Sequence, residues 1–165
     1  MNTQSNSQNL TEHEGFCEPT LCSAPDGSVI LLMRTGCPRP SYIARSTDKC
    51  KTWSKPQIFD ECGVFPQLLS LPSGVTLASY GRPSLRIRAT SDPSCEVWES
   101  PIRIALSGEP SSNFQALSCF YTGLMQISDD EALLIYSDFK YPNPDGIPVK
   151  TILSRRIKAV FDDDR

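Results

Sequence analysis

The sequence is poor in the residues on which several common kinds of catalysis depend. Its 165 residues include one histidine, His13, which lies between two glutamates in a polar N-terminal segment. A histidine there is expected to be solvated, and to act neither as a base nor as a metal ligand. The seven cysteines are irregularly spaced and form no CxxC pair, so we expect no metal and no cofactor. Free structural thiols are the first interpretation, and disulfides of an exported parent protein are the alternative.

Long apolar runs and a basic stripe are also missing. No segment approaches the roughly 18 apolar residues of a membrane span, and the opening MNTQSNSQNLTEHEG is too polar for a secretory signal. The net charge is -3, and the lysines and arginines are dispersed along the chain. We therefore expect no membrane and no nucleic acid among the partners, and a cytoplasmic location by default.

A repeat takes the place of helical patterning. No 3.6-residue apolar periodicity persists, and 14 prolines interrupt the chain. Three segments instead match one another: 21–32 (LCSAPDGSVILL), 68–79 (LLSLPSGVTLAS) and 124–135 (LMQISDDEALLI). Each has an apolar strand, a tight polar turn and a second apolar strand, and is predicted to be a β-hairpin. Gly27 and Gly74 supply the positive φ that the first two turns need.

Further strands follow each hairpin. Third β-like runs are expected at residues 42–45, 85–90 and 149–157. Within the second of these runs, Arg86 and Arg88 alternate with apolar residues, as on a half-exposed outer strand. In the first two units a short fourth strand follows a tryptophan, and the two tryptophans lie 45 residues apart. A repeat of this length with four short strands predicts a propeller blade.

The predicted fold is therefore all-β, a partial β-propeller of about three four-stranded antiparallel blades. A single globular domain fits the length and the hydrophobic fraction of 39%. We expect a polar flexible leader at residues 1–15, the propeller portion at 16–160 and a solvated acidic tail at 161–165.

The turn from Ser46 to Trp53, STDKCKTW, resembles the Asp-box, S-x-D-x-G-x-T-W, of the sialidase (neuraminidase) superfamily and related propellers. Cys50 stands where that motif has glycine. A second, degraded copy runs from Thr90 through Asp92 to Trp98. The aspartate of such a turn is expected to accept turn hydrogen bonds and the tryptophan to pack between sheets. The resemblance implies the C-terminal portion of a six-bladed BNR-repeat propeller, in which these motifs are structural.

Alignment of the hairpins puts Glu18, Phe65 and Tyr121 at one repeat position, three residues before the first apolar residue of each hairpin. Because the first strand of a propeller blade lines the central channel, we expect Glu18 and Tyr121 to approach each other across the axis. Arg34 and Arg82 follow the second strands and are expected at the same channel mouth. Two guanidinium groups there suit a sugar that carries a carboxylate. The alternatives are a core tyrosine, and arginines in solvated loops or ordinary ion pairs.

The sialidase resemblance assigns chemistry to these residues. Tyr121 in CFYTGL is similar to the family's nucleophile, and Glu18 in FCEPTL to the glutamate that takes its proton. Arg34 in LLMRTG and Arg82 in GRPSLRIR resemble members of the arginine triad that binds the carboxylate of sialic acid. A tyrosine nucleophile avoids the like-charge repulsion that a carboxylate would meet at that sugar. No match exists for the first arginine of the triad or for the acid/base aspartate.

The resemblance thus implies an exo-α-sialidase-like glycoside hydrolase of retaining type, or a fragment of one, incomplete for catalysis alone. Its partner would be a sialic-acid-containing glycan. The alternatives are a non-catalytic glycan-binding or structural propeller, and a propeller glycosidase that acts on another sugar. The last repeat shows three strands, and in the family the N-terminus supplies the fourth. We therefore expect a missing N-terminal half, or self-association through exposed blade edges.

Overall fold

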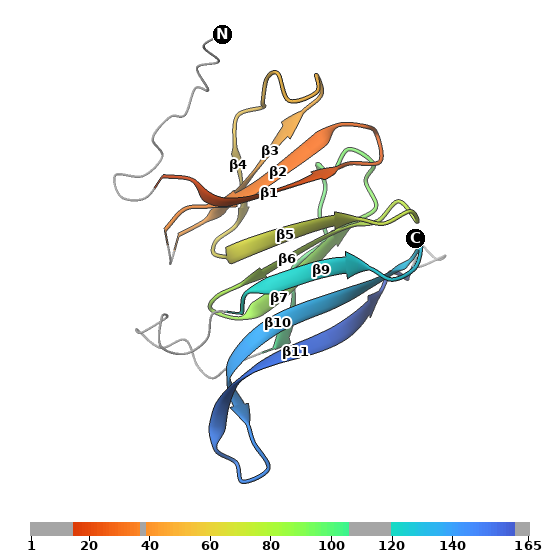
Figure 1. Ribbon diagram of the computed structural model, residues 1–165. Helices are drawn as coiled ribbons and strands as arrows, with labels where there is room; N and C mark the ends of the chain where they lie inside the picture. Colours follow the sequence, from red (N-terminus) through yellow and green to blue (C-terminus); the bar gives the residue numbers. More distant parts are fainter. Residues whose placement is uncertain (1–14, 37–38, 106–119, 161–165) are drawn as a thin grey trace.

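A computed structural model describes residues 15–36, 39–105 and 120–160. These residues form eleven β-strands in three antiparallel sheets, and they include no helix (Figure 1). In each sheet the strands lie in sequence order. Blade 1 contains β1 (Cys17–Ser23), β2 (Val29–Arg34), β3 (Ser41–Ser46) and β4 (Gln57–Asp60). Blade 2 contains β5 (Val64–Ser70), β6 (Thr76–Gly81), β7 (Leu85–Thr90) and β8 (Ile102–Ala105). Blade 3 contains β9 (Thr122–Gln126), β10 (Glu131–Pro142) and β11 (Pro148–Lys158).

The all-β prediction and the three blade-like sheets are confirmed. The predicted hairpins and third strands all form, and the third strand of blade 2 has the predicted bounds. The described residues give the last blade three strands, as the repeat pattern indicates. The expected leader and acidic tail lie outside the described residues, apart from Gly15.

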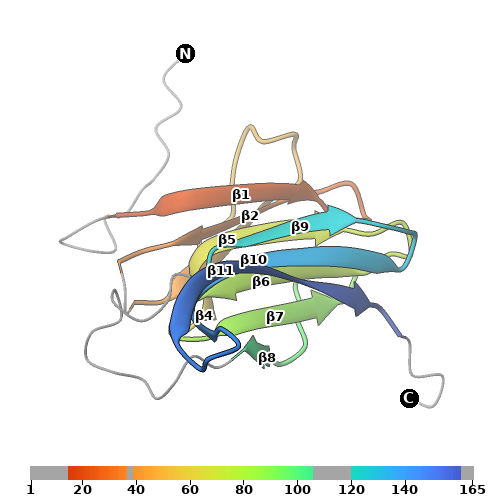
Figure 2. The ribbon, with the colours of Figure 1, turned by 60° about the horizontal axis from the view of Figure 1, so that its bottom comes forward.

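The first strands of the three blades lie side by side. β1 contacts β5, β5 contacts β9, and all three run in the same direction (Figures 1 and 2). Their N-terminal ends therefore meet at one end of the molecule. This arrangement brings the starts of three strands that are far apart in sequence to a common location.

Tight turns close the hairpins and link neighbouring blades. Gly27 and Gly74 adopt φ angles of 84° and 89°, which a side chain would disfavour. The turn of blade 1 reaches blade 2 through the amide of Asp26, which donates to the carbonyl of Pro93 at 3.1 Å. The turn of blade 2 reaches blade 3 through the amide of Ser73, 2.9 Å from the carbonyl of Asp129.

The apolar core lies between the blades. Leu32 of blade 1 packs with Ala78 and Tyr80 of blade 2, and Leu77 on the other face of β6 packs with Ala132 of blade 3. All six residues of β6 are buried, because blade 2 is covered on both faces. In β2 and β10, buried and partly exposed residues alternate over much of the strand, because these strands are covered mainly on one face.

A buried ionic group ties blade 1 to blade 2. The carboxylate of Asp60 on β4 accepts from the hydroxyl of Tyr80 at 2.5 Å and from Arg86 Nη1 at 2.8 and 3.0 Å. Burial, followed by the hydrogen bond to Asp60, raises the pKa of Tyr80 above its ordinary value, so its hydroxyl remains a donor. The prediction of a half-exposed strand is wrong for Arg86, since its side chain is 11% exposed. The neighbouring Arg88 lies over the ring of Phe59 on β4, with its Cζ 4.6 Å from the ring centroid.

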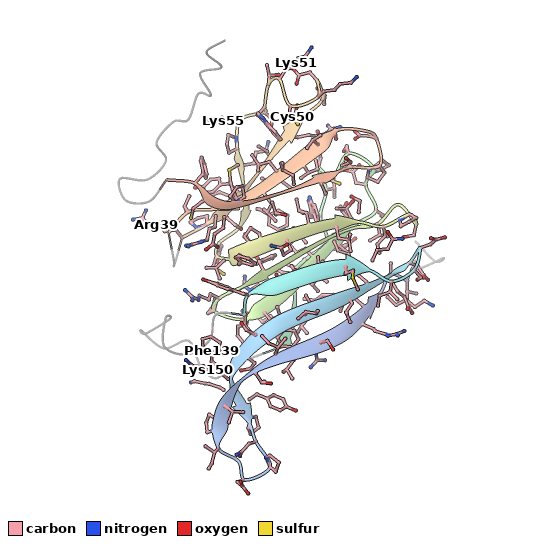
Figure 3. All side chains as sticks on the ribbon, viewed as in Figure 1. Arg39, Cys50, Lys51, Lys55, Phe139 and Lys150 are labelled. Atoms are coloured by element: carbon pink, nitrogen blue, oxygen red, sulfur yellow. The ribbon has the colours of Figure 1, made fainter. Side chains whose placement is uncertain are left out.

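The two aspartate turns are hydrogen-bonded clasps, as their residue types predict. Asp48 accepts from the amide and hydroxyl of Thr52, and these bonds lower its pKa to about 2. The pKa of Asp92 is also lowered to about 2, chiefly by the amides of residues 94 and 97. Cys50 and Cys95 take positive φ angles of 63° and 55° in these turns. Cys50 lies at the tip of a loop that projects beyond β3 and β4 (Figure 3).

The two tryptophans differ in their surroundings. Trp98 packs edge-on against Phe59, with ring centroids 5.1 Å apart, and so contributes to the interface between blades 1 and 2. Trp53 is exposed, which differs from the expected packing between sheets. The cysteines at positions 17, 22, 50, 62 and 95 are free thiols, and the remaining two lie outside the described residues.

Candidate functional site

The predicted site residues of blade 1 form one rigid unit at the start of β1. Glu18 accepts two hydrogen bonds from Arg34, one from Nε at 2.7 Å and one from Nη2 at 3.0 Å. This two-pronged geometry is the strongest that a guanidinium and a carboxylate can form. The two side chains are 23% and 18% exposed. Arg34 is therefore already engaged by a protein carboxylate.

Phe65 links this unit to blade 3. Its amide donates to Glu18 Oε2 at 2.6 Å, so the carboxylate of blade 1 is tied to the first strand of blade 2. Its ring stacks on Tyr121, with centroids 4.7 Å apart and planes 21° apart. The guanidinium carbon of Arg82 lies 5.9 Å from the centroid of the Tyr121 ring. Residues at or next to the start of each first strand thus form a single chain of contacts.

Tyr121 is positioned through its backbone and its neighbours. Its amide donates to the hydroxyl of Ser137 on β10 at 3.1 Å, and its carbonyl accepts from the Ser137 amide at the same distance. The adjacent Thr122 hydroxyl lies 3.3 Å from the carbonyl of Phe65 and 2.9 Å from the hydroxyl of Ser79. These bonds hold β9 against blade 2 while the phenol ring remains exposed.

The backbone is strained at this end of the molecule. Glu18, Phe65, Arg82 and Phe120 are not glycines, yet they adopt φ angles of 48°, 47°, 48° and 41°. At the first two positions the strand register shifts, so each residue forms a bulge at the same point of its blade. Such conformations cost roughly 1–3 kcal/mol each and concentrate at functional sites. In blade 3 the positive φ falls on Phe120, one position before the aligned Tyr121.

All four predicted site residues lie in this cluster, but not in the predicted arrangement. Glu18 and Tyr121 come to the same end of the blades, with Phe65 between them. Within the described residues, no hydrogen bond joins the Glu18 carboxylate to the Tyr121 hydroxyl. The two arginines do not form one clamp, because Arg34 is bonded to Glu18 and Arg82 lies beside the tyrosine ring.

Sequence reasoning missed the parts played by Phe65 and Ser137. The repeat alignment did place Phe65 at the same position as Glu18 and Tyr121, which was a usable signal. No sequence signal marked Ser137, because an isolated serine inside an apolar strand belongs to no recognisable pattern.

This arrangement places Arg82 beside the partly exposed pair of Phe65 and Tyr121. Exposed aromatic faces suit the apolar faces of a sugar ring, and arginine suits a carboxylate or hydroxyl groups. The described residues include no group of three or more His, Cys, Asp or Glu side chains that could hold a metal ion. None of the described segments forms a helix long and apolar enough to span a membrane.

Comparison with known proteins supports the fold. No protein-family model matches the chain, and no curated protein matches its sequence. A crystal structure of a protein of unknown function from Dyadobacter fermentans is similar, with 22% identity and a TM-score of 0.67, over 90% of this chain and 40% of that one. An α-L-arabinofuranosidase from Fusarium graminearum, bound to an iminosugar inhibitor, is similar with 21% identity and a TM-score of 0.56, over 86% and 45% of the two chains.

At such identities these likenesses show the fold alone, which the chain shares with part of each of the two structures. The chain spans less than half the length of both structures that it resembles.

Proposed function

We propose that this chain is part of a sialidase-like glycoside hydrolase and contributes a sugar-binding portion of its active site. The observation that carries the proposal is the chain of contacts that joins Glu18, Phe65 and Tyr121, which lie at or next to the starts of the three first strands. Arg34 and Arg82 flank it. Strained backbone at Glu18, Phe65 and Arg82 further supports a functional role.

In this proposal Tyr121 attacks the anomeric carbon of a sialoside as the glycosidic bond breaks, and the leaving oxygen takes a proton from an acid that this chain does not supply. Water then hydrolyses the covalent glycosyl–tyrosine intermediate and frees the phenol. Glu18 takes the phenolic proton as the new bond forms. A phenol needs such help, because its ordinary pKa near 10 makes it a weak nucleophile at neutral pH. Arg82 binds the sugar carboxylate. The exposed aromatic pair supports the ring.

The chain alone is expected to bind the sugar without hydrolysing it. Its sequence has no counterpart of the acid/base aspartate, so no group would protonate the leaving oxygen. The direct contact between phenol and carboxylate that proton transfer requires is also not made within the described residues. Binding and turnover must therefore be measured separately.

Titration calorimetry with sialic acid tests the binding step. We expect measurable binding, weakened at least about tenfold by Arg82→Met, because a charge-assisted hydrogen bond is worth about 1.5–3 kcal/mol. Arg103→Met is the matched control, since Arg103 is an exposed arginine on the same blade. Equal affinities for the two variants would overturn the role of Arg82.

Hydrolysis of a fluorogenic sialoside tests the chemistry. We expect no turnover above the uncatalysed rate from the chain alone. If turnover occurs, Tyr121→Phe must abolish it while leaving sialic acid binding measurable. Turnover that survives this substitution would contradict the assignment of Tyr121 as nucleophile.

A second candidate is a glycosidase-like site for a neutral sugar, and one observation favours it. Arg34 is already paired with Glu18, so one of the two predicted carboxylate ligands is engaged by the protein. One structural neighbour is an α-L-arabinofuranosidase. Binding of L-arabinose without binding of sialic acid would favour this candidate, and Arg82→Met would then change affinity little.

A further inference from the structure

The two outer blades each present an apolar face that the described chain leaves partly exposed. On blade 3 this face, here called the exit face, carries Met125, Leu133, Ile135 and Ile152. The strand register places them together. Leu133, Ile135 and Ser137 alternate along one face of β10. Met125 on β9 lies opposite Leu133, and Ile152 on β11 lies opposite Ser137. The opposite face packs on blade 2 through Ala132 and Leu134.

Blade 1 has a corresponding face on its far side, here called the entry face. It carries Leu21, Leu31, Tyr42 and Ile58. Met33 and Ala44 lie on the same face and are buried, so the exposed part of this face is around Leu21 and Ile58. Leu21 lies opposite Leu31, and Tyr42 lies opposite Ile58. Leu32, the next residue along β2, points the other way and packs on blade 2.

Comparison of equivalent repeat positions relates these two faces to the interfaces between the blades. In blade 2 the positions that correspond to Leu31 and Leu133 are Ala78 and Leu77, which are fully covered by the neighbouring blades. Ser79, which corresponds to Ile135, is 0% exposed, whereas Ile135 is 42% exposed. The exit and entry faces thus correspond to the two halves of a blade-to-blade interface, and no described segment of this chain supplies the other half of either one.

The exposure is substantial for apolar side chains. Ile152 on the exit face is 67% exposed, and Leu21 on the entry face is 56% exposed. Contiguous exposed apolar residues of this kind mark interaction surfaces in soluble proteins. Because the three blades are stacked face to face, the exit face of one copy repeats the geometry that blade 1 presents to blade 2.

We infer that two copies of this chain associate head to tail, the exit face of each packing on the entry face of the other. The occupant follows from the chain itself, which contains both complementary surfaces. A heterologous contact of this type closes into a ring when the rotation allows it. The chain spans 40% and 45% of two structures with this fold, so two copies approximate the full length of such a structure.

Closure would also complete the wall of the candidate site. Tyr121 and two exit-face residues, Ile135 and Ile152, line one surface hollow at the end of blade 3 where the first strands begin. The β1 strand of a second copy would then lie beside this tyrosine. The inference does not depend on which sugar the site binds.

Sedimentation velocity of the full chain over a range of concentrations tests the association. We expect a species of twice the 18.3 kDa chain mass. Ile135→Asp and Leu21→Asp should each raise the dissociation constant at least about a hundredfold, because each places a carboxylate in an apolar interface. Val97→Asp is the control, since Val97 is an exposed apolar residue of the second aspartate turn and lies on neither face.

The dissociation constants of the single variants and of their mixture distinguish a head-to-tail dimer from other contacts. A head-to-tail contact requires both single variants to weaken the dimer, and an equimolar mixture of the two should recover association, because one intact exit face then meets one intact entry face. If Ile135→Asp failed to fold by circular dichroism, Ile152→Asp would replace it on the same face. A monomer at all concentrations, an effect of only one variant, or an open-ended series of larger species would each overturn the inference.

Discussion

The buried ionic group between blades 1 and 2 makes a sharp prediction about stability. Arg86→Met should destabilise the chain by about 3–5 kcal/mol, because it leaves the Asp60 carboxylate buried without its cation. The side chains of Asp60 and Arg86 are 7% and 11% exposed, so water cannot readily replace the lost partner. A loss of this size is a large share of the roughly 5–15 kcal/mol by which a domain is stable.

Urea unfolding provides the assay. Trp98 fluorescence is a suitable probe because the indole packs on Phe59 at the same interface. The matched control is Arg156→Met, which removes a surface ion pair of 3.7 Å in which the arginine is 73% exposed. Such a pair contributes about 0–1 kcal/mol. Equal costs for the two methionine variants would refute the view that the Asp60 group holds the blades together.

Two further variants separate charge burial from lost packing. Asp60→Asn in the Arg86→Met background removes the uncompensated charge and should recover part of the lost stability, which a double-mutant cycle would quantify. Tyr80→Phe removes one donor to Asp60 and should cost about 1–3 kcal/mol. If Arg86→Met does not fold, Tyr80→Phe still tests the same group.

Three other predictions concern the turns and the thiols. The pKa values of Asp48 and Asp92 are lowered to about 2 from 3.8, so the stability that these carboxylates contribute is complete above about pH 4 and is lost as pH falls towards about 2. The urea midpoint should therefore fall across this pH range. It should fall less in a variant with asparagine at both positions. Trp98→Ala should cost about 3–5 kcal/mol in urea unfolding, because the indole fills the interface between blades 1 and 2. Cys50 should react with a thiol reagent much faster than Cys95, as mapped by mass spectrometry, because Cys50 is exposed whereas burial raises the pKa of Cys95; equal rates would contradict this.

The strand order was predictable because it depends on local patterns. The hairpin at residues 68–79 shows this, since its alternating apolar residues and its Gly74 turn specify both strands without reference to the rest of the chain. The prediction for Arg86 failed for the opposite reason. Its alternation with apolar residues is the same whether its partner is water or a carboxylate on another blade, and Asp60 lies 26 positions earlier.

The sequence was sufficient to predict which residues lie in the candidate site, but not which of their side chains contact one another. Equivalent repeat positions identify Glu18, Phe65 and Tyr121, since tandem blades superpose their first strands. Side-chain pairing follows from finer geometry. A bidentate bond between Glu18 and Arg34 depends on the bulge at Glu18, which no residue pattern announces. The positive φ angles at Glu18 and Phe65 were likewise not evident from the sequence, and neither was the positive φ at Phe120, one position before the aligned residue of blade 3.

The bulges also bear on why these side chains are present at all. Glycine adopts a positive φ without the penalty that a side chain incurs, so folding alone would favour glycine at positions 18 and 65. Both positions instead carry large side chains, and both side chains make contacts that reach another blade or another strand. Phe65 and Tyr121 stack on each other and are still 37% and 43% exposed. The positive φ at positions 18 and 65, together with a partly exposed aromatic pair, is the reason that the sugar-binding proposal rests on these strand starts and not on the aspartate turns.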